Sequence, residues 1–231
     1  MGLGQKLLGG PHGHADDGSG GHIRRARLYE FAATIGFAGF RRRIYDDLVT
    51  LSGAKPGDQV LDVGCGTGYL TRRAAHAVTP GGHVVGVDPS PPVIDYATRT
   101  APPNCTFHLA TAEAIPEPDA AFDVVMSSLA IHHLPPQHRP TAFHEMHRVL
   151  RPGGHLLIAD FRPPRNRLAN HLIGALSGHA MQHNPIEQFA QLITDAGFRI
   201  TGSGNRRPWL HYIQAQRPTG TSTPRSAESA S

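Results

Sequence analysis

Residues 60–70 read Val60-Leu61-Asp62-Val63-Gly64-Cys65-Gly66-Thr67-Gly68-Tyr69-Leu70. The apolar, partly β-branched residues at the start of this segment predict a strand that is buried on both faces. Glycines then follow at every second position, where they allow a sharp turn and let a ligand approach the backbone without meeting a Cβ atom. A helix that begins near Tyr69 would point its free N–H groups and the positive end of its dipole at that ligand. The segment therefore predicts a strand, a ligand-binding glycine turn and a helix in succession.

A second strand is predicted at residues 83–88 and ends at Asp88, which lies twenty residues after Gly68. An acidic residue at about this spacing commonly accepts hydrogen bonds from the hydroxyl groups of a ribose. The glycines argue against NAD, because the dinucleotide motif G-x-G-x-x-G needs a glycine at the position of Tyr69. The two strands together predict a ribose-binding site that departs from the NAD pattern.

Residues 62–68 resemble motif I of the class I S-adenosylmethionine-dependent methyltransferases. Three later segments look like further motifs of the ubiquinone/menaquinone-biosynthesis-like branch of that family, the methyltransferase 11 type of domain: residues 112–116, 122–125 and 148–154. The resemblance covers residues 55–161, about half of the chain. It implies S-adenosyl-L-methionine as the cofactor and is unspecific for the methyl acceptor.

Strands and helices alternate strictly through this region, which implies crossover units and a parallel sheet. We expect an α/β fold, with a Rossmann-like doubly wound seven-stranded sheet that is mostly parallel, has one antiparallel strand and carries helices on both faces. A helix is predicted near residues 138–150 that buries Phe143, Met146, His147 and Leu150 and is stopped by residues 152–154, with the next strand at 155–161. The last two strands, near residues 198–201 and 210–213, are expected to form a hairpin.

The ends of the chain differ in composition from its centre. Residues 1–22 are rich in glycine and histidine, and residues 216–231 are rich in serine, threonine and proline, so disordered tails are predicted at both ends. The expected domain covers residues 23–215 as a single methyltransferase domain. Within it, residues 23–55 form an N-terminal helical cap and residues 162–184 form an insertion on the substrate side.

Composition narrows the possible partners. The net charge of +4 is mild, and the arginines that crowd residues 24–43 are expected on a solvated helix face rather than on a nucleic-acid-binding patch. The two cysteines fit a reducing compartment, so a cytoplasmic protein is predicted. No apolar run approaches the ~20 residues that span a membrane. A small-molecule acceptor is the expected partner, and no metal site is expected.

The resemblance, taken residue by residue, assigns cofactor binding to the glycine turn and to the ends of the following strands. Asp88 is expected to bind the ribose hydroxyls, and Asp62 to hold the loop or the cofactor's ammonium group. The resembled family usually has an Asp that binds the adenine amino group at the position where this chain has Thr111. The predicted cofactor-binding residues are Asp62, Gly64, Cys65, Gly66, Gly68, Asp88, Pro89, Ala112, Glu113 and Ser128.

His132 and His133 are expected at the end of the fourth strand, facing the crevice where ligands bind in such sheets. His133 is the candidate catalytic residue, because a histidine can take a proton from an acceptor hydroxyl; cofactor or pocket contact is its alternative role. The predicted substrate-binding residues are Tyr29, His133, Phe161, His179 and His183.

The predicted function is S-adenosylmethionine-dependent methyl transfer to a small acceptor that is lipophilic, aromatic or quinone-like. Two alternatives stay open: a nucleic-acid or protein methyltransferase, and a non-catalytic protein that binds the cofactor. The arginine cluster motivates the first alternative. However, DNA amino-methyltransferases have an Asn/Asp-Pro-Pro-Tyr/Phe stretch in common. At that place, residues 127–130 of this chain read Ser-Ser-Leu-Ala.

Overall fold

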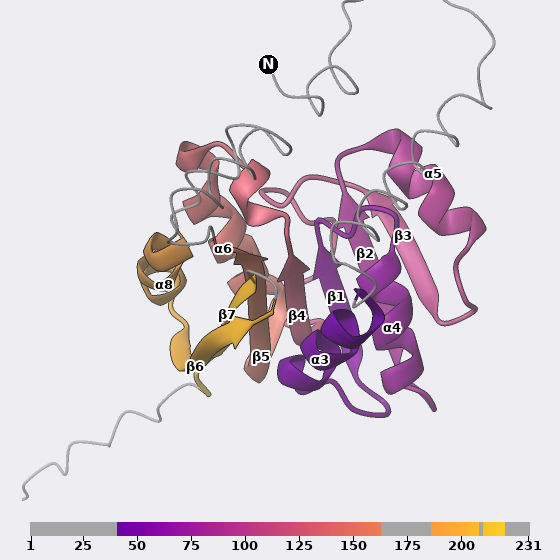
Figure 1. Ribbon diagram of the computed structural model, residues 1–231, viewed down its shortest axis with the longest axis horizontal. Coiled ribbons are helices and arrows are strands. Elements are labelled where there is room, and N and C mark those ends of the chain that lie inside the picture. The colour runs from indigo at the N-terminus through magenta and orange to yellow at the C-terminus, as the bar shows by residue number, and fades with distance from the viewer. Residues whose placement is uncertain (1–40, 163–185, 208–209, 220–231) are drawn as a thin grey trace, which may run out of the picture.

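The computed structural model describes residues 41–162, 186–207 and 210–219. They form a seven-stranded sheet in the order β3-β2-β1-β4-β5-β7-β6 (Figure 1). Neighbouring strands from β3 to β5 are parallel, whereas β7 runs antiparallel to both β5 and β6, so the predicted sheet with one antiparallel strand is confirmed. The strands are β1 (Gln59–Val63), β2 (His83–Asp88), β3 (Cys105–Leu109), β4 (Phe122–Ser128), β5 (Leu150–Phe161), β6 (Arg199–Arg206) and β7 (Leu210–Gln216).

The strand order reverses at the centre of the sheet. From β1 the chain moves outward to β2 and β3, and then crosses back to β4, which pairs with β1 on its other side. The carboxyl ends of two such strands border a crevice, because the connections that follow them diverge. The glycine turn follows β1 and Ser128 ends β4, so both features lie at this crevice.

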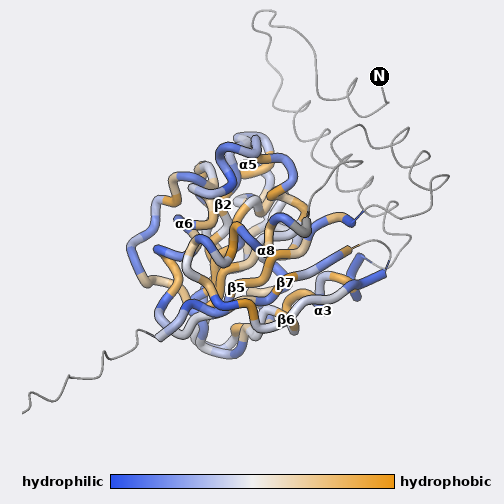
Figure 2. The backbone as a smooth tube through the Cα atoms, turned by 90° about the vertical axis from the view of Figure 1, so that its left-hand side faces the viewer, coloured by the Kyte–Doolittle hydropathy of each residue, from blue (hydrophilic) through white to orange (hydrophobic). Residues whose placement is uncertain are grey.

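Helices cover both faces of the sheet, as predicted, because side chains alternate along each strand. In β1, Val60 packs with α3 and α4 on one face, whereas Leu61 and Val63 pack with α6 and α8 on the other. Figure 2 shows the hydrophobic stretches of the backbone running through the interior along the strands. The helices are α3 (Arg41–Ser52), α4 (Tyr69–Ala77), α5 (Pro91–Arg99), α6 (Arg139–Val149) and α8 (Ile186–Asp195), with short 3-10 turns η1 (Ile131–His133) and η2 (Pro136–His138).

The junction between α6 and β5 differs from the prediction. The helix ends at Val149, and β5 already begins at Leu150, which pairs with Phe122; the next pair is Val124 with His155. Residues 151–154 therefore lie within β5 as a register shift rather than as the stop of the helix. Phe143 and Met146 are fully buried as expected, but His147 is only half-buried, and the buried Leu150 belongs to the strand.

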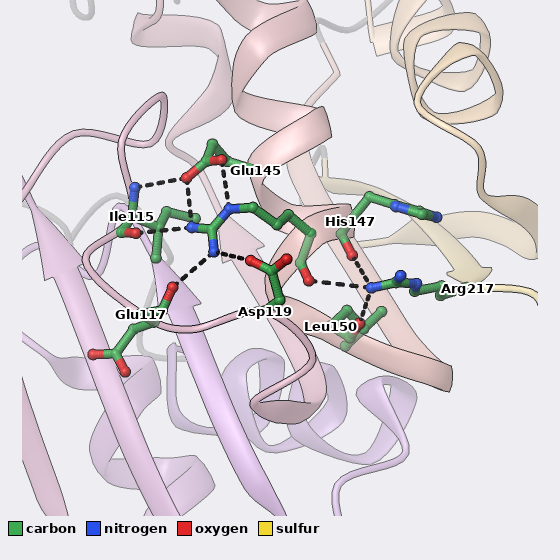
Figure 3. Close-up of polar contacts among 8 residues, drawn as sticks. Ile115, Glu117, Asp119, Glu145, His147, Leu150 and Arg217 are labelled. Atoms are coloured by element: carbon green, nitrogen blue, oxygen red, sulfur yellow. Dashed lines mark hydrogen bonds and ion pairs between the residues drawn. The ribbon is translucent and has the colours of Figure 1, made fainter.

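The predicted C-terminal tail begins too early. Gln216 is the last residue of β7, and the Arg217 backbone exchanges hydrogen bonds with Gly153 and Gly154. Arg217 Nη1 also donates to three carbonyl oxygens at the end of α6, those of His147 (2.8 Å), Arg148 (3.1 Å) and Leu150 (2.5 Å) (Figure 3). Carbonyls at a helix C-terminus have no partner within the helix, so a cation there completes their hydrogen bonding. Gln216 and Arg217 thus belong to the folded domain.

We expect Arg217→Ala to lower the free energy of unfolding by roughly 1.5–3 kcal/mol, the usual contribution of hydrogen bonds to a charged group. Arg199→Ala is the matched control, because Arg199 is exposed and donates only a side-chain hydrogen bond to Gln216 near the same end of β7. Denaturant unfolding of both variants measures the difference. Equal stability losses in the two variants would show that the carbonyl contacts of Arg217 contribute nothing.

Several predictions lie outside the described residues. These include the tails at 1–22 and 220–231, most of the N-terminal cap and of the insertion, and the candidate substrate residues Tyr29, His179 and His183. Of the arginine cluster, the structure describes only Arg41, Arg42 and Arg43. The Arg42 side chain is 77% exposed, but Arg41 is buried, which contradicts a solvated position for that residue. Among the described residues, no helix has the length and apolar character needed to cross a bilayer.

Candidate functional site

A cavity of about 400 Å³ opens at the crevice between the carboxyl ends of β1 and β4. Its wall includes the glycine turn after β1, the end of β2, the connection after β3, the end of β4 and part of α3. Nine of the ten predicted cofactor-binding residues line it: Asp62, Gly64, Cys65, Gly66, Asp88, Pro89, Ala112, Glu113 and Ser128.

The glycine turn is fixed by its backbone. The N–H groups of Gly64 and Cys65 both donate to the carbonyl oxygen of Val87, at 2.8 and 3.0 Å, which ties the turn to the end of β2. Gly64 has φ +73°, and a Cβ atom there would lie 2.3 Å from the Ala130 Cβ atom, so only glycine fits. Gly66 has φ +53° and faces open space, because a Cβ atom added at that residue would meet no protein atom within 4 Å.

Asp88 connects β2 to the glycine turn. One of its carboxylate oxygens accepts from the Gly66 N–H and the other from the Ser90 N–H, each at 2.9 Å. Ser90 is the N-cap residue of α5, and its side chain makes no capping hydrogen bond. Burial raises the pKa of Asp88 above its usual value, and the two backbone hydrogen bonds oppose that rise. The carboxylate remains half-buried on the cavity wall, where its free lone pairs can accept further hydrogen bonds.

Asp62 lies deeper, at the base of the cavity, and is 1% exposed. It accepts a hydrogen bond of 2.7 Å from the Thr71 hydroxyl on α4. Burial raises the pKa of Asp62 from 3.8 to about 7, and nearby Asp88 adds to the rise. The neighbouring Cys65 is buried too, and burial raises the pKa of its thiol, so Cys65 acts as a neutral packing residue rather than as a nucleophile.

A cation also lines the cavity. The Arg41 guanidinium carbon lies 3.9 Å from the centroid of the Tyr69 ring and 5.7 Å from that of Tyr45, and all three residues line the cavity. Such stacking on aromatic faces orients a guanidinium group and stabilises it. The cavity lining therefore includes both carboxylates and a positive group, which suits a ligand that carries both charges.

The connection after β3 supplies a further part of the wall. Ala110, Thr111, Ala112 and Glu113 line the cavity, and Ala112 is buried. The Glu113 carboxylate lies 3.0 Å from His138 Nδ1 in η2, so this wall is linked to the segment that follows β4.

The end of β4 supplies the opposite wall. The Ser128 hydroxyl oxygen is buried and has no hydrogen-bond partner among the described residues, although it lies on the cavity lining. The next residue, Leu129, has φ +56°, an uncommon conformation for a residue other than glycine. Strained backbone of this kind clusters at binding sites. A buried hydroxyl without a partner and a strained residue both indicate that a ligand completes this wall.

The two histidines of η1 have different surroundings. His132 Nδ1 lies 2.7 Å from Asp160, which is fully buried in β5, and Asp160 also accepts from the His132 N–H at 3.1 Å. His132 therefore anchors the turn. His133 lines the cavity, and burial together with the adjacent His132 lowers the pKa of His133 to about 4. At neutral pH His133 is uncharged and a weak base.

Two predicted residues do not line the cavity. Gly68 precedes α4 with φ +77°, and a Cβ atom there would lie 2.6 Å from the Phe107 ring, so packing explains this glycine. Phe161 is buried at the end of β5, where it pairs with Leu210. Conversely, Arg41, Tyr45 and Tyr69 line the cavity without having been predicted as site residues. A Tyr immediately after the last glycine of the turn is the signal that could have found Tyr69.

The chain is similar to known methyltransferases. Residues 60–154 match a family model described as a methyltransferase domain. The curated relatives include the ubiquinone/menaquinone biosynthesis C-methyltransferase UbiE of Ectopseudomonas mendocina, 38% identical over 52% of this chain and 48% of the relative. The same enzyme from a Shewanella species is 34% identical over 52% of this chain and 49% of the relative. The chain thus spans about half the length of these curated relatives.

Solved structures agree on the fold. A SAM-dependent methyltransferase from Aquifex aeolicus aligns with a TM-score of 0.64 at 20% identity, covering 75% of this chain and 89% of that one. The [4+2]-cyclase SpnF aligns with a TM-score of 0.62 at 19% identity, covering 77% of this chain and 82% of that one. At such identities the likeness concerns the fold alone.

Residues 60–154 match a methyltransferase domain, and the fold is that of the class of S-adenosylmethionine-dependent methyltransferases. The curated relatives that the chain matches over about half of its length are, by their printed names, ubiquinone/menaquinone biosynthesis C-methyltransferases. The residues of the cavity fit the cofactor of the class. Gly66 leaves open space beside the backbone, the Ser128 hydroxyl needs a partner, and Arg41 and Asp62 supply opposite charges.

Proposed function

We propose that this chain transfers the methyl group of S-adenosylmethionine to a small lipophilic acceptor of aromatic or quinone-like character. The observation that carries the proposal is a cavity that unites the glycine turn, Asp88, Asp62 and the Ser128 hydroxyl. The curated relatives, by their printed names, methylate carbon during ubiquinone and menaquinone biosynthesis, which supports an acceptor of that class.

The strand order predicts how the cofactor lies. Asp88, at the end of β2, would accept hydrogen bonds from the ribose hydroxyls, and an ionised carboxylate accepts two such bonds well. The base would then extend toward the connection after β3, beside Ala112 and Glu113, because β3 neighbours β2. The methionine end would extend the other way, with its ammonium group at Asp62 and its carboxylate toward Arg41.

When bound, S-adenosylmethionine supplies a methyl group that its sulfonium centre has already activated. The residues of the chain then have to align the acceptor with that methyl group and exclude water. Orientation of two reactants in this way can contribute roughly 7–11 kcal/mol to lowering a barrier. His133 lines the cavity in its neutral form. It suits a hydrogen bond to the acceptor better than removal of a proton, because a group with a pKa of about 4 is a weak base at pH 7.

Methyl transfer from labelled S-adenosylmethionine to a panel of acceptors tests the proposal. The panel holds reduced quinones and phenols with hydrocarbon tails, and, as a contrast, RNA, DNA and a protein lysate. Label on a quinone-like or phenolic compound is the expected result, and NMR of the product distinguishes methylation at carbon from methylation at oxygen. Label on nucleic acid or protein alone would contradict the proposal. Tight cofactor binding without transfer to any acceptor would favour a non-catalytic cofactor-binding protein.

The raised pKa of Asp62 predicts a proton linkage. The unfolded chain releases this proton near pH 4 and the folded chain near pH 7, so the stabilising contribution of Asp62 is full below about pH 4 and lost as the pH rises through about 7. An ammonium group at Asp62 would favour its ionised form. We therefore expect cofactor binding at pH 7 to release protons from the wild-type protein.

Calorimetric titrations in two buffers with different ionisation enthalpies measure this release. Asp62→Asn is the matched variant, because it keeps the shape of the side chain and removes its proton equilibrium. The wild type should release more protons than the variant, by up to about half a proton for a group at its pKa. Equal proton release in the two proteins would place the ammonium group away from Asp62.

A further inference from the structure

The connection between β3 and β4 covers residues 110–121, all of which the structure describes, and contains no helix. Its first part nevertheless forms the cavity wall at Ala112 and Glu113. A coil has no internal ladder of hydrogen bonds, so its backbone groups need partners elsewhere if the wall is to keep one conformation. Some of those partners lie within the connection or in β2. Side chains of α6, on the face of the sheet opposite α3 and α4, bond both backbone groups of Ile115 and the Glu117 carbonyl.

Arg148 of α6 uses all three nitrogen atoms of its guanidinium group on this connection and on Glu145 (Figure 3). Nε and Nη2 donate to the two carboxylate oxygens of Glu145, each at 2.8 Å, in the forked geometry that favours Arg–carboxylate pairs. Nη1 donates to the Glu117 carbonyl at 2.8 Å and to the Asp119 carboxylate at 2.7 Å. Nη2 also donates to the Ile115 carbonyl at 3.0 Å.

Glu145 completes the arrangement. Its Oε2 atom accepts a hydrogen bond of 3.0 Å from the Ile115 N–H, so the Arg148–Glu145 pair bonds both backbone groups of Ile115. The Ile115 side chain is 4% exposed and belongs to the same hydrophobic core as Ala112. The hydrogen bond to Arg148 lowers the pKa of Glu145, so the pair stays charged. The connection is thereby fixed two residues after Glu113.

We propose that Arg148, together with Glu145, positions the part of the cavity wall that would contact the purine base. By holding residues 115–119 against α6, Arg148 determines where Ala112 and Glu113 lie and so sets affinity and selectivity for the purine. This inference rests on the proposed function, because it takes the cavity as the S-adenosylmethionine site. Neither side chain of the pair lines the cavity, so both act through the connection.

The test compares binding of S-adenosylhomocysteine with binding of its inosine counterpart, in which an oxygen replaces the amino group of adenine. The variants are Arg148→Ala, Arg148→Lys and Glu145→Gln. Arg73→Ala is the matched control, because Arg73 is also a half-buried arginine paired with a carboxylate, that of Asp46, but it joins α4 to α3. Calorimetry gives each Kd, and thermal unfolding shows that each variant is folded.

We expect Arg148→Ala to weaken S-adenosylhomocysteine binding by about tenfold and to reduce the preference for adenine, because the forked contacts are lost. Arg148→Lys keeps the charge without the fork and should show the same loss of preference; it decides the question if Arg148→Ala does not fold. Arg73→Ala should lose stability but keep the Kd and the preference within about twofold of the wild type.

Two negative results are distinguishable. A wild-type protein that binds neither compound would overturn the proposed function and this inference with it. A wild type that binds S-adenosylhomocysteine, with folded Arg148 variants that keep both Kd values and their ratio within about twofold, would overturn this inference alone and make Arg148 a purely stabilising residue.

Discussion

Replacement of Asp88 by alanine is expected to weaken S-adenosylmethionine binding by at least about 100-fold, because hydrogen bonds to a charged group contribute roughly 1.5–3 kcal/mol each and two ribose hydroxyls would lose their acceptor. The same substitution releases the Gly66 N–H, which now bonds to the Asp88 carboxylate, and so loosens the glycine turn as well. Both effects act in the same direction on affinity. Calorimetric titration of the wild type and the variant measures the change.

The control for Asp88→Ala is Asp95→Ala. Asp95 is an exposed acidic residue on α5, on the helix that directly follows, and it does not line the cavity. Its replacement changes the net charge equally and should leave the Kd unchanged. If Asp88→Ala and Asp95→Ala bind the cofactor equally well, Asp88 does not bind the ribose, and the proposed position of the cofactor is wrong.

Gly66→Ala is expected to reduce cofactor affinity strongly. Its loss of stability should come almost entirely from placing alanine in a left-handed backbone conformation. A Cβ atom at Gly66 meets no protein atom within 4 Å, so the added methyl group enters the cavity and competes with the cofactor for space. Forcing extra methyl groups into a close-packed contact costs typically 1–3 kcal/mol, which corresponds to a roughly 5- to 150-fold weaker Kd.

Gly57→Ala is the matched control for that experiment. Gly57 also has a positive φ, +91°, and a Cβ atom there also meets nothing within 4 Å, but Gly57 does not line the cavity. Both variants should therefore lose about 1–2 kcal/mol of stability from the left-handed backbone. Only Gly66→Ala should lose cofactor affinity. Similar affinities in the two variants would show that no ligand approaches the backbone at Gly66.

Much of this architecture could be predicted from local patterns. The run from Val60 to Leu70 carries the strand, the turn and the start of the helix in consecutive residues, and the spacing to Asp88 follows from one crossover unit. The parallel sheet and the antiparallel strand β7 were predicted correctly, but the expected strict alternation was wrong at residues 110–121, because the connection between β3 and β4 contains no helix. The features that were predicted correctly are therefore those that depend on residues close to one another in the sequence.

The remainder depends on contacts between distant segments. Arg41 belongs to a run of arginines that suggests a solvated helix face. However, α3 packs against α4, and this packing places the Arg41 guanidinium over the Tyr69 ring. Arg217 lies where the composition already resembles a tail, but it bonds carbonyl groups about seventy residues earlier in the chain. Arg148 lies in a segment that resembles a motif, but its bonds to Ile115 and Glu117 span more than thirty residues. Local composition contains no trace of these pairings.

The measurement that tests the central claim most directly is calorimetric titration of the wild-type chain with S-adenosylmethionine and, separately, with NADH. We expect S-adenosylmethionine to bind with a Kd on the order of micromolar, or about −8 kcal/mol, and NADH not to bind. Folded protein that binds NADH, or that binds neither compound, would contradict the assignment of the cavity between β1 and β4 as the S-adenosylmethionine site.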